Sequence, residues 1–182
     1  MKILVCGKAP CLPDELKDRT LNEFDIVVRV NNWLPIKNRC NRFDAWVFYP
    51  WHSPLMHEKS ENSNYDFTPY LKQNPKLWLG HAWAKEECKK VSAKYPDHTF
   101  TLEEFNSIMT DAKTYSHTTG VFAIHLAMKL SDNVTIAGFD FYSGTRAYYQ
   151  NDEPVINAHM HNPDFIFIRV EKQINKGLVK WI

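Results

Sequence analysis

The sequence predicts an α/β fold, in the form of a single Rossmann-like domain in which helices flank a mostly parallel sheet. Short apolar, β-branched segments recur along the 182 residues, and helical segments stand between them, as in a sheet built from crossover units. No internal repeat, linker or second core interrupts residues 1–182, so one domain is expected. Hydrophobic residues make up 44% of the chain, which excludes a disordered protein.

Four strands are predicted in the first half of the chain. Residues 2–7 form an apolar run that ends at a glycine, and residues 25–31 are rich in β-branched side chains. Residues 44–50 form a third run that a proline stops, and residues 75–80 are predicted as the fourth strand. The stretch 51–74 is rich in Ser, Asn, Pro and aromatic residues without a regular period, and it is predicted to be a lid or irregular insertion.

Turns and helices are predicted around these strands. Residues 11–24 indicate a turn followed by a weak helix or a loop. Residues 85–96 are typical of a polar surface helix that ends before a proline. A second helix is predicted at 101–109, because Thr101 and Glu104 have the spacing of a capping box.

The second half of the chain continues the alternation of helices and strands. Residues 119–130 are the strongest predicted helix, and they carry so little polar surface that the helix should be largely buried. A strand is predicted within 133–142. A last helix is predicted at 162–177, with asparagine as its cap, proline in its first turn and glycine at its end, and 178–182 are predicted as the closing strand.

Residues that carry chemistry follow the predicted strands at their carboxyl ends, which is where open α/β sheets bind ligands. Turn residues, amides and aromatic residues occupy these strand ends, where charged residues would be expected if the ends served only solubility. The first strand is followed by Gly7, Lys8 and Pro10, the second by Asn31 and Asn32, and the fifth by Phe139, Asp140 and Tyr142. We therefore expect a binding site at this edge, with residues 139–142 at its mouth.

The start of the apolar helix is a candidate anion site. Thr118, Thr119 and Gly120 offer backbone N–H groups and two hydroxyls at a helix N-terminus, which favours a phosphate or carboxylate. A threonine at this position also serves simply as a helix cap, and on this stretch alone the cap is the better-supported interpretation.

The turns after the first two strands permit two interpretations each. The turn at Gly7 lacks the three glycines of a dinucleotide fingerprint and the ending of a P-loop, so Lys8 either contacts a phosphate or is solvated. Asn31 and Asn32 either read a base or sugar with their amides or form an ordinary turn.

The loop after the fifth strand carries candidate groups for stabilising charge. Tyr148 and Tyr149 lie in this predicted loop, and their phenolic hydroxyls either stabilise a leaving group or only pack. Asp140, at the strand end, either holds a substrate or caps a turn.

Two histidines share a loop that runs into the last predicted helix. His159 or His161 can act as a general base at neutral pH. The pair could instead bind a metal, although no third ligand is evident, and a surface loop without a role is the third interpretation. His125 lies within the apolar helix, where a hydrogen-bonded core histidine is expected.

Composition excludes several functional classes. The net charge is +1 and the basic residues form no run, so nothing indicates nucleic-acid binding. The four cysteines form no Cys-x-x-Cys pair and no zinc-finger spacing. The N-terminus lacks the features of a signal peptide, and no apolar run reaches membrane length. A cytoplasmic protein with reduced thiols and no transmembrane segment is expected.

Four motifs, in order along the chain, resemble those of the sialyltransferases. The segments ILVCGKAPCL and FDIVVRVNN resemble the family's first motif, a glycine-proline turn followed by Asp-x-x-x-Arg-x-Asn. TTGVFAIHLAMKLSDNVTIAGFDFY resembles the second motif, which is Ser/Thr-Gly, an apolar helix and then Val-x-Ile-x-Gly-Phe/Ile-Asp-Phe-Tyr. Tyr148 and Tyr149 resemble the third motif, and His159 followed by Asp164 resembles the fourth, with Asp for Glu.

This resemblance implies the GT-A-like fold variant of the sialyltransferases and an inverting, metal-independent glycosyltransferase without a cofactor. The implied donor is a CMP-sugar that carries sialic acid or a related ulosonic or nonulosonic acid. The implied acceptor is a hydroxyl group of a glycan or of another molecule. The implied partners are thus this nucleotide-sugar donor and this acceptor.

Site roles also follow from the resemblance. His159 would take the proton of the acceptor hydroxyl, and Tyr142 together with Tyr148 or Tyr149 would hydrogen-bond the departing phosphate. The cytidine monophosphate would be lined by Gly7, Pro10 and Asn31, and Thr118, Thr119 and Gly120 would lie near the phosphate or the donor's carboxylate.

The chain departs from the family pattern at three positions. Lys8 stands where the family has asparagine, Cys11 where it has serine, and Ser116 where bacterial members carry arginine. Lys8 or His117 could then supply charge near the donor.

Two further questions stay open at the sequence level. A transferase that uses another nucleotide donor, or a catalytically silent nucleotide-binding module, fits the same fold. Aromatic residues are frequent between 46 and 83, where they could stack on sugars or form a protein interface, including that of a homo-oligomer.

Overall fold

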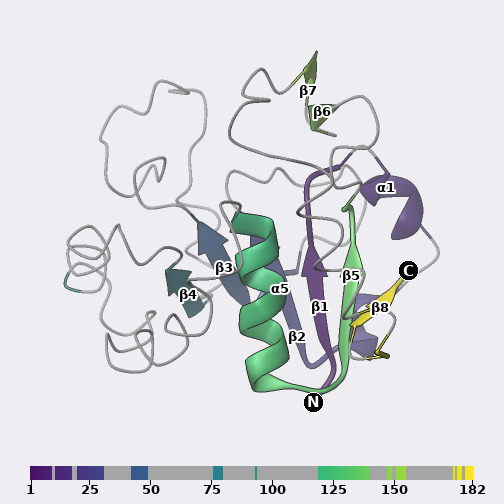
Figure 1. Cartoon of the computed structure of the whole chain (residues 1–182). Coiled ribbons are helices and arrows are strands. Elements are labelled where there is room, and N and C mark those ends of the chain that lie inside the picture. The colour runs from purple at the N-terminus through teal and green to yellow at the C-terminus, as the bar shows by residue number, and fades with distance from the viewer. Residues whose placement is uncertain are drawn as a thin grey trace.

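A six-stranded parallel sheet organises this computed structural model (Figure 1). Its strand order is β4-β3-β2-β1-β5-β8, and every neighbouring pair is parallel. The strands are β1 (Ile3–Cys6), β2 (Ile26–Val30), β3 (Ala45–Phe48), β4 (Lys76–Leu79), β5 (Val134–Ala137) and β8 (Val179–Trp181). The predicted α/β class with a mostly parallel sheet is thus confirmed, and each of the six predicted strands is present in slightly shorter form.

Three helices and a small hairpin complete the described elements. They are α1 (Leu12–Glu15), the 3₁₀-helix η1 (Leu21–Glu23), α5 (Thr119–Leu130), and the antiparallel pair β6 (Ala147–Tyr148) and β7 (Asn151–Pro154). The predicted weak helix or loop at 11–24 is therefore α1, with a proline in its first turn, followed by η1. Tyr148, predicted in a loop, lies in a two-residue strand instead.

The structure describes part of the chain. The predicted insertion at 51–74 and the predicted helices at 85–96, 101–109 and 162–177 lie outside it, apart from single residues, and the single-domain interpretation stays a prediction. The described residues are 1–9, 11–17, 20–30, 42–48, 76–79, 93, 119–139, 147–148, 151–154, 174, 176–177 and 179–182.

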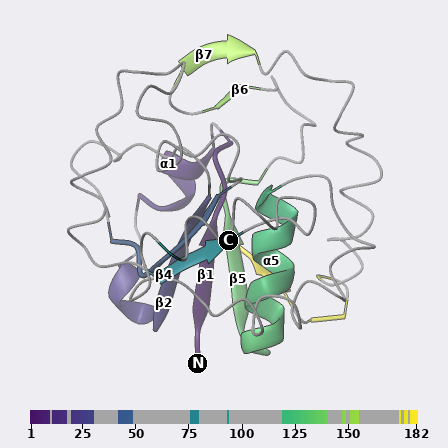
Figure 2. The same ribbon diagram turned by 90° about the vertical axis from the view of Figure 1, so that its left-hand side faces the viewer.

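Helices cover both faces of the central strands, which explains why β1 is apolar at every position. Side chains alternate between the two faces of a strand. Leu4 and Cys6 pack on one face with Leu12 of α1 and with Leu21 and Phe24 around η1. The apolar helix α5 packs over β1, β2, β3 and β5, on the opposite face (Figure 2). The prediction that this helix is largely buried is confirmed, and its buried residues are Thr119, Val121, Phe122, Ala123, Ile124, Leu126 and Ala127.

The order of the strands reverses beside β1. From β1 the chain adds β2, β3 and β4 in one direction, and it then returns to place β5 and β8 on the other side of β1. This reversal makes the carboxyl ends of β1 and β5 the topological switch point of the sheet. In doubly wound sheets, ligands bind in the crevice at this point.

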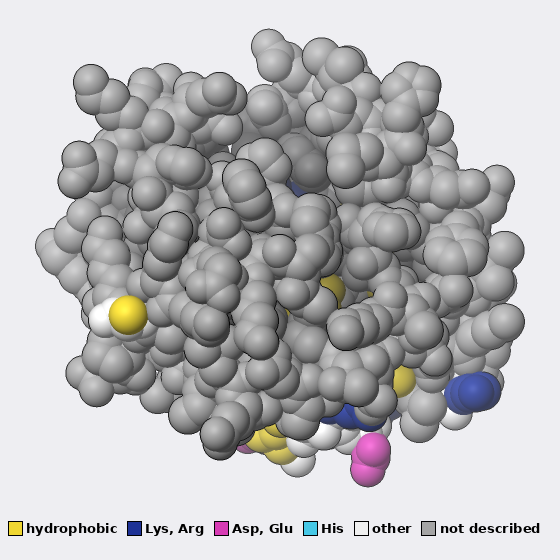
Figure 3. Space-filling view, turned by 60° about the vertical axis from the view of Figure 1, so that its left-hand side comes forward, with side chains coloured by type: hydrophobic (Ala, Val, Ile, Leu, Met, Phe, Trp, Pro, Cys, Tyr) yellow, Lys and Arg dark blue, Asp and Glu magenta, His cyan; other side chains and the backbone are white. Residues whose placement is uncertain are grey.

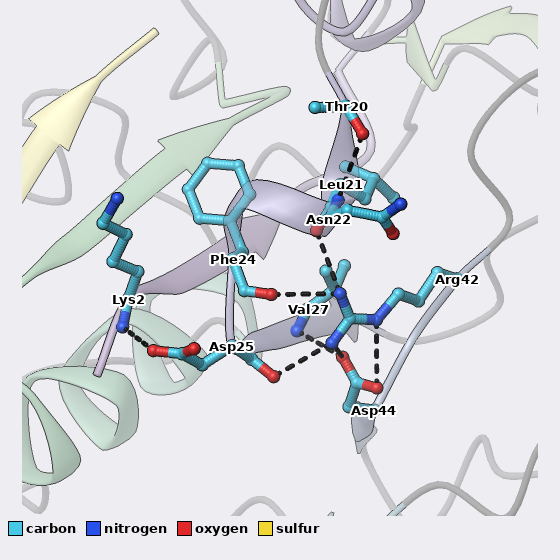
Figure 4. Close-up of polar contacts among 9 residues, drawn as sticks. All are labelled: Lys2, Thr20, Leu21, Asn22, Phe24, Asp25, Val27, Arg42 and Asp44. Carbon is cyan, nitrogen blue, oxygen red and sulfur yellow. Dashed lines mark hydrogen bonds and ion pairs between the residues drawn. The ribbon is translucent and has the colours of Figure 1, made fainter.

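At the opposite end, where the strands begin, a hub of polar contacts surrounds Arg42 (Figure 4). Its guanidinium donates hydrogen bonds to the carbonyl oxygens of Leu21 (3.0 Å), Phe24 (3.0 Å) and Asp25 (2.9 Å). It also pairs with the Asp44 carboxylate at 2.9 Å. On the face shown in Figure 3, most of the charged side chains that the structure describes lie at the lower end of the molecule, where the strands begin. Arg42 therefore joins the segment before β2 to the start of β3.

Replacing Arg42 with methionine should lower the free energy of unfolding by about 2 kcal/mol, because three backbone carbonyls lose a charged donor while water still reaches part of the site. Equilibrium unfolding in urea measures this change. Lys17→Met, at an exposed position just after α1, is the matched control and should change stability by less than about 0.5 kcal/mol. Equal free energies of unfolding for the two variants would show that the contacts of Arg42 contribute nothing to stability.

Candidate functional site

The backbone turns that leave β1 and β5 are hydrogen-bonded to each other. The N–H of Gly7 donates to the carbonyl oxygen of Ala137 at 2.8 Å, and the N–H of Ala9 donates to that of Gly138 at 2.9 Å. The pairing of the two strands thus continues beyond their ends. Lys8 lies between these two bonds, so its backbone is held directly at the switch point.

Three glycines allow the turns after β1 and β5 and the start of α5 to approach one another closely. We call this meeting point of Gly7–Ala9, Gly138–Phe139 and Thr119–Gly120 the seam. A Cβ built on Gly7 would lie 2.1 Å from the carbonyl oxygen of Gly138, which no side chain can accommodate. Gly138 has φ of 69°, and a Cβ there would lie 2.7 Å from the Cβ of Leu12. A Cβ on Gly120 would lie 2.9 Å from Cε1 of Phe139, and the Phe139 ring is also within 3.1 Å of the position of a Gly7 Cβ. The glycines at 7 and 120 therefore converge on one aromatic ring.

The start of α5 lies at the same edge of the sheet. Thr119 and Gly120 begin this 12-residue helix, and the contact of Gly120 with Phe139 places them beside the exit of β5. Thr119 is buried, with 6% of its surface exposed. The first turn of a helix leaves N–H groups without intrahelical acceptors and carries a partial positive charge. This edge of the sheet is therefore suited to an anion.

The electrostatic setting of Lys8 reinforces this suitability. Burial lowers the pKa of Lys8 from 10.5 to about 8, because the charged ammonium loses hydration. An anion placed nearby would favour the charged form again. The seam therefore combines a helix N-terminus with a lysine whose ammonium has lost part of its hydration.

Two charged residues near the seam are not among the site residues that the sequence predicts. Glu15 of α1 accepts a hydrogen bond from the N–H of Gly138 at 2.5 Å. Its partner is 123 residues away in the chain, so no local pattern signals the contact. Arg29 is 1% exposed in β2, in register with Cys6 of β1. A signal for Arg29 exists, since a charged residue inside a β-branched strand is unusual.

The described structure brings four of the predicted site residues to one place: Gly7, Lys8, Thr119 and Gly120. Tyr148 is placed in β6, opposite Asn151 of β7. The other predicted site residues lie outside the described residues, namely Pro10, Asn31, Asn32, Thr118, Asp140, Tyr142, Tyr149 and His159.

Two further predictions, a metal site and a core histidine, can be compared with the described residues only in part. Within the described ranges, no three His, Cys, Asp or Glu side chains gather as a metal site would require, but His159 and His161 lie outside those ranges. His125 is half-buried in α5, in the helix where a core histidine is expected. Of the helices in the described ranges, none has the length and apolar character needed to span a membrane.

Comparison with known proteins gives a match in structure and not in sequence. No family model matches the chain, and no curated protein matches it significantly. Among solved structures, it is similar to the sialyltransferase CstII from Campylobacter jejuni in complex with a substrate analogue, cytidine-5'-monophosphate, with a TM-score of 0.62 and 17% identity. The match covers 99% of this chain and 78% of that one. The chain thus has the α/β fold of this sialyltransferase structure, which agrees with the resemblance of the motifs.

Proposed function

We propose that this protein is an inverting, metal-independent glycosyltransferase that moves sialic acid, or a related ulosonic or nonulosonic acid, from a CMP-sugar to an acceptor hydroxyl. One observation carries the proposal. The Gly7–Lys8 turn, the start of α5 and the exit of β5 meet at the switch point of a sheet whose fold matches a sialyltransferase solved with cytidine monophosphate.

The donor's phosphate suits this seam for electrostatic reasons. The N-terminus of α5 at Thr119 and Gly120 favours negative charge, and the ammonium of Lys8 is under-solvated. In the proposed reaction, the bond between the anomeric carbon and the phosphate oxygen breaks and CMP departs with the electron pair. The Lys8 ammonium and the N–H groups at the seam would stabilise that charge most when it is fully developed, which is how they would accelerate the reaction.

The acceptor side of the reaction needs one base. In the proposal, His159 takes the proton from the acceptor hydroxyl as its oxygen attacks the anomeric carbon from the face opposite CMP, which inverts the configuration. Tyr142 and Tyr148 or Tyr149 donate hydrogen bonds to the leaving phosphate. The cytidine monophosphate is lined by Gly7, Pro10, Asn31 and Asn32, with Thr118 and Asp140 on the donor side.

Calorimetric titration with CMP in a chelator, with UMP, ADP and GDP as comparators, tests the donor assignment. We expect CMP to bind with at least about tenfold preference, which corresponds to roughly 1.4 kcal/mol. Addition or removal of divalent metal should leave the affinity unchanged. Equal affinity for all four nucleotides would refute a CMP-sugar donor.

His159→Ala separates binding from turnover. We expect it to keep the CMP affinity of the wild type and to lower transfer by about 100-fold or more, because a general base contributes on this scale. A coupled assay of CMP release from CMP-sialic acid, with and without acceptor, measures turnover. CMP binding without any release by the wild type would instead identify a silent nucleotide-binding module.

A further inference from the structure

The peptide groups around Gly138 are held from three sides by one short segment. The N–H of Gly138 donates to the Glu15 carboxylate at 2.5 Å, and its carbonyl oxygen accepts from the N–H of Ala9 at 2.9 Å. The third side is closed by Leu12, whose Cβ would be 2.7 Å from a Cβ at Gly138. Ala9, Leu12 and Glu15, which follow β1, therefore hold the exit of β5.

Of these three contacts, the one from Glu15 is made by a charged side chain. Hydrogen bonds from N–H groups to carboxylates are shorter and stronger than those between neutral groups. The bond is partly buried, which limits competition from water. It is thus the contact of the three that a substitution can remove while the backbone and the Leu12 packing stay in place.

Gly138 needs such an external restraint. Its φ is 69°, a region that glycine enters as easily as the opposite sign of φ. A glycine at this position therefore permits the turn but does not by itself select one direction for the following residues. The Glu15 carboxylate contributes to this selection from the preceding side, because it accepts the N–H of the Ala137–Gly138 peptide in one orientation. The next peptide is held through the Gly138 carbonyl oxygen, which accepts the Ala9 N–H.

The residue whose direction depends on this selection is Phe139, the centre of the candidate site. Its ring contacts the positions of Gly7 and Gly120, which belong to the turn after β1 and to the start of α5. We infer that Glu15 is a positioning residue: by fixing the Gly138 peptide, it holds Phe139 between these two segments and thereby keeps the nucleotide site assembled. This inference rests on the proposed function, since the site it supports is the proposed donor site.

Three variants isolate this role. Glu15→Ala removes the acceptor, whereas Glu15→Gln keeps an oxygen acceptor on a side chain of the same length and removes the charge. Asp14→Ala changes a neighbouring carboxylate that is exposed on the same short helix, so it controls for altered charge and helix propensity.

Amide hydrogen exchange tests the positioning without any ligand. In Glu15→Ala, the Gly138 N–H should exchange at least about tenfold faster relative to the neighbouring β5 amides, because its partly buried, charged bond is worth about 1.4 kcal/mol or more. Asp14→Ala should keep the exchange rate of the wild type, and Glu15→Gln should lie between the wild type and Glu15→Ala, because it keeps an oxygen acceptor but loses the charge. An unchanged Gly138 rate in Glu15→Ala would overturn the inference, whatever the protein binds.

Titration with CMP tests the consequence for the site. We expect Glu15→Ala to bind CMP at least about tenfold more weakly, Glu15→Gln to restore the affinity to within about threefold, and Asp14→Ala to match the wild type. A Glu15→Ala variant with fast Gly138 exchange and unaltered CMP affinity would overturn the role in the site. If the wild type binds no CMP, the proposed function fails, while the exchange experiment still decides the role of Glu15 in the fold.

Discussion

Replacing Gly7 with alanine should lower the free energy of unfolding by more than about 3 kcal/mol, which is a large part of the stability of a domain of this size. The added Cβ would lie 2.1 Å from the carbonyl oxygen of Gly138 and 2.9 Å from its carbonyl carbon. Both are backbone atoms, so no rotamer change relieves the clash. The turns after β1 and β5 would have to separate, and the Gly7–Ala137 and Ala9–Gly138 hydrogen bonds would break.

Two other glycines provide graded controls for this substitution. At Gly177, φ is 71° but nothing lies within 4 Å of an added Cβ, so Gly177→Ala should show backbone strain alone, about 1 kcal/mol. At Gly120, the Cβ would meet the Phe139 ring at 2.9 Å, so Gly120→Ala should fall between the two. Urea unfolding at neutral pH gives the three values. If Gly7→Ala were no less stable than Gly177→Ala, the close approach of the two turns would be refuted.

The elements that can be predicted from sequence are those with a local hydrophobic signal. The predicted helix at 119–130 coincides with α5, because its apolar residues repeat within a few turns. The predicted strands are one or two residues too long at most ends. The fifth strand, predicted within 133–142 and followed by residues 139–142, ends at Ala137, because the positive φ of Gly138 is incompatible with strand geometry.

The candidate site is predictable in its location and not in its contacts. The rule that ligands bind at the carboxyl ends of parallel strands assigns Gly7 and Lys8 to one edge from sequence alone. Gly120, predicted separately at a helix N-terminus, lies beside them in the folded chain. The bond between Glu15 and Gly138 cannot be found in this way, because its partners are 123 residues apart and neither residue is unusual in its local setting. The lowered pKa of Lys8 also depends on its burial in the folded chain, which local sequence does not report.

Lys8→Met should make the protein more stable at pH 7 and weaken its binding of CMP. The pKa of Lys8 is about 8 in the folded protein and 10.5 in the unfolded chain, so the folded state binds the proton less tightly. Below pH 8 the ammonium is charged in both states and destabilises the fold by up to about 3 kcal/mol, with solvent screening reducing this value. Methionine fills a similar volume without charge and removes the penalty.

The pH dependence of stability has a definite sign. Between pH 8 and 10.5 the unfolded chain holds more protons than the folded protein, so the free energy of unfolding of the wild type should rise with pH and level off above that range. Lys8→Met should lack this rise, whereas Lys17→Met, at an exposed position, should retain it. Urea unfolding at pH 7, 9 and 10.5 measures the slopes. Parallel slopes for wild type and Lys8→Met would show that Lys8 is not the titrating group.

Binding of CMP should reverse the effect of burial, because the phosphate stabilises the charged ammonium and raises the pKa of Lys8. At pH 8.5 to 9 the phosphate of CMP is already fully ionised, since its second pKa is about 6, so any proton taken up on binding belongs to the protein. Calorimetry in buffers with different ionisation enthalpies should then show proton uptake by the wild type and none by Lys8→Met.

The same substitution should weaken CMP binding by about 10- to 100-fold, the range expected for losing a charged hydrogen bond. Greater stability together with weaker CMP binding in Lys8→Met would indicate that Lys8 serves ligand binding and lowers the stability of the fold. A merely structural lysine would give the opposite pattern, with lower stability and unchanged affinity after Lys8→Met. The motif resemblance predicts an asparagine at the position of Lys8. An asparagine cannot take up a proton, so Lys8→Asn should abolish the proton uptake as completely as methionine does.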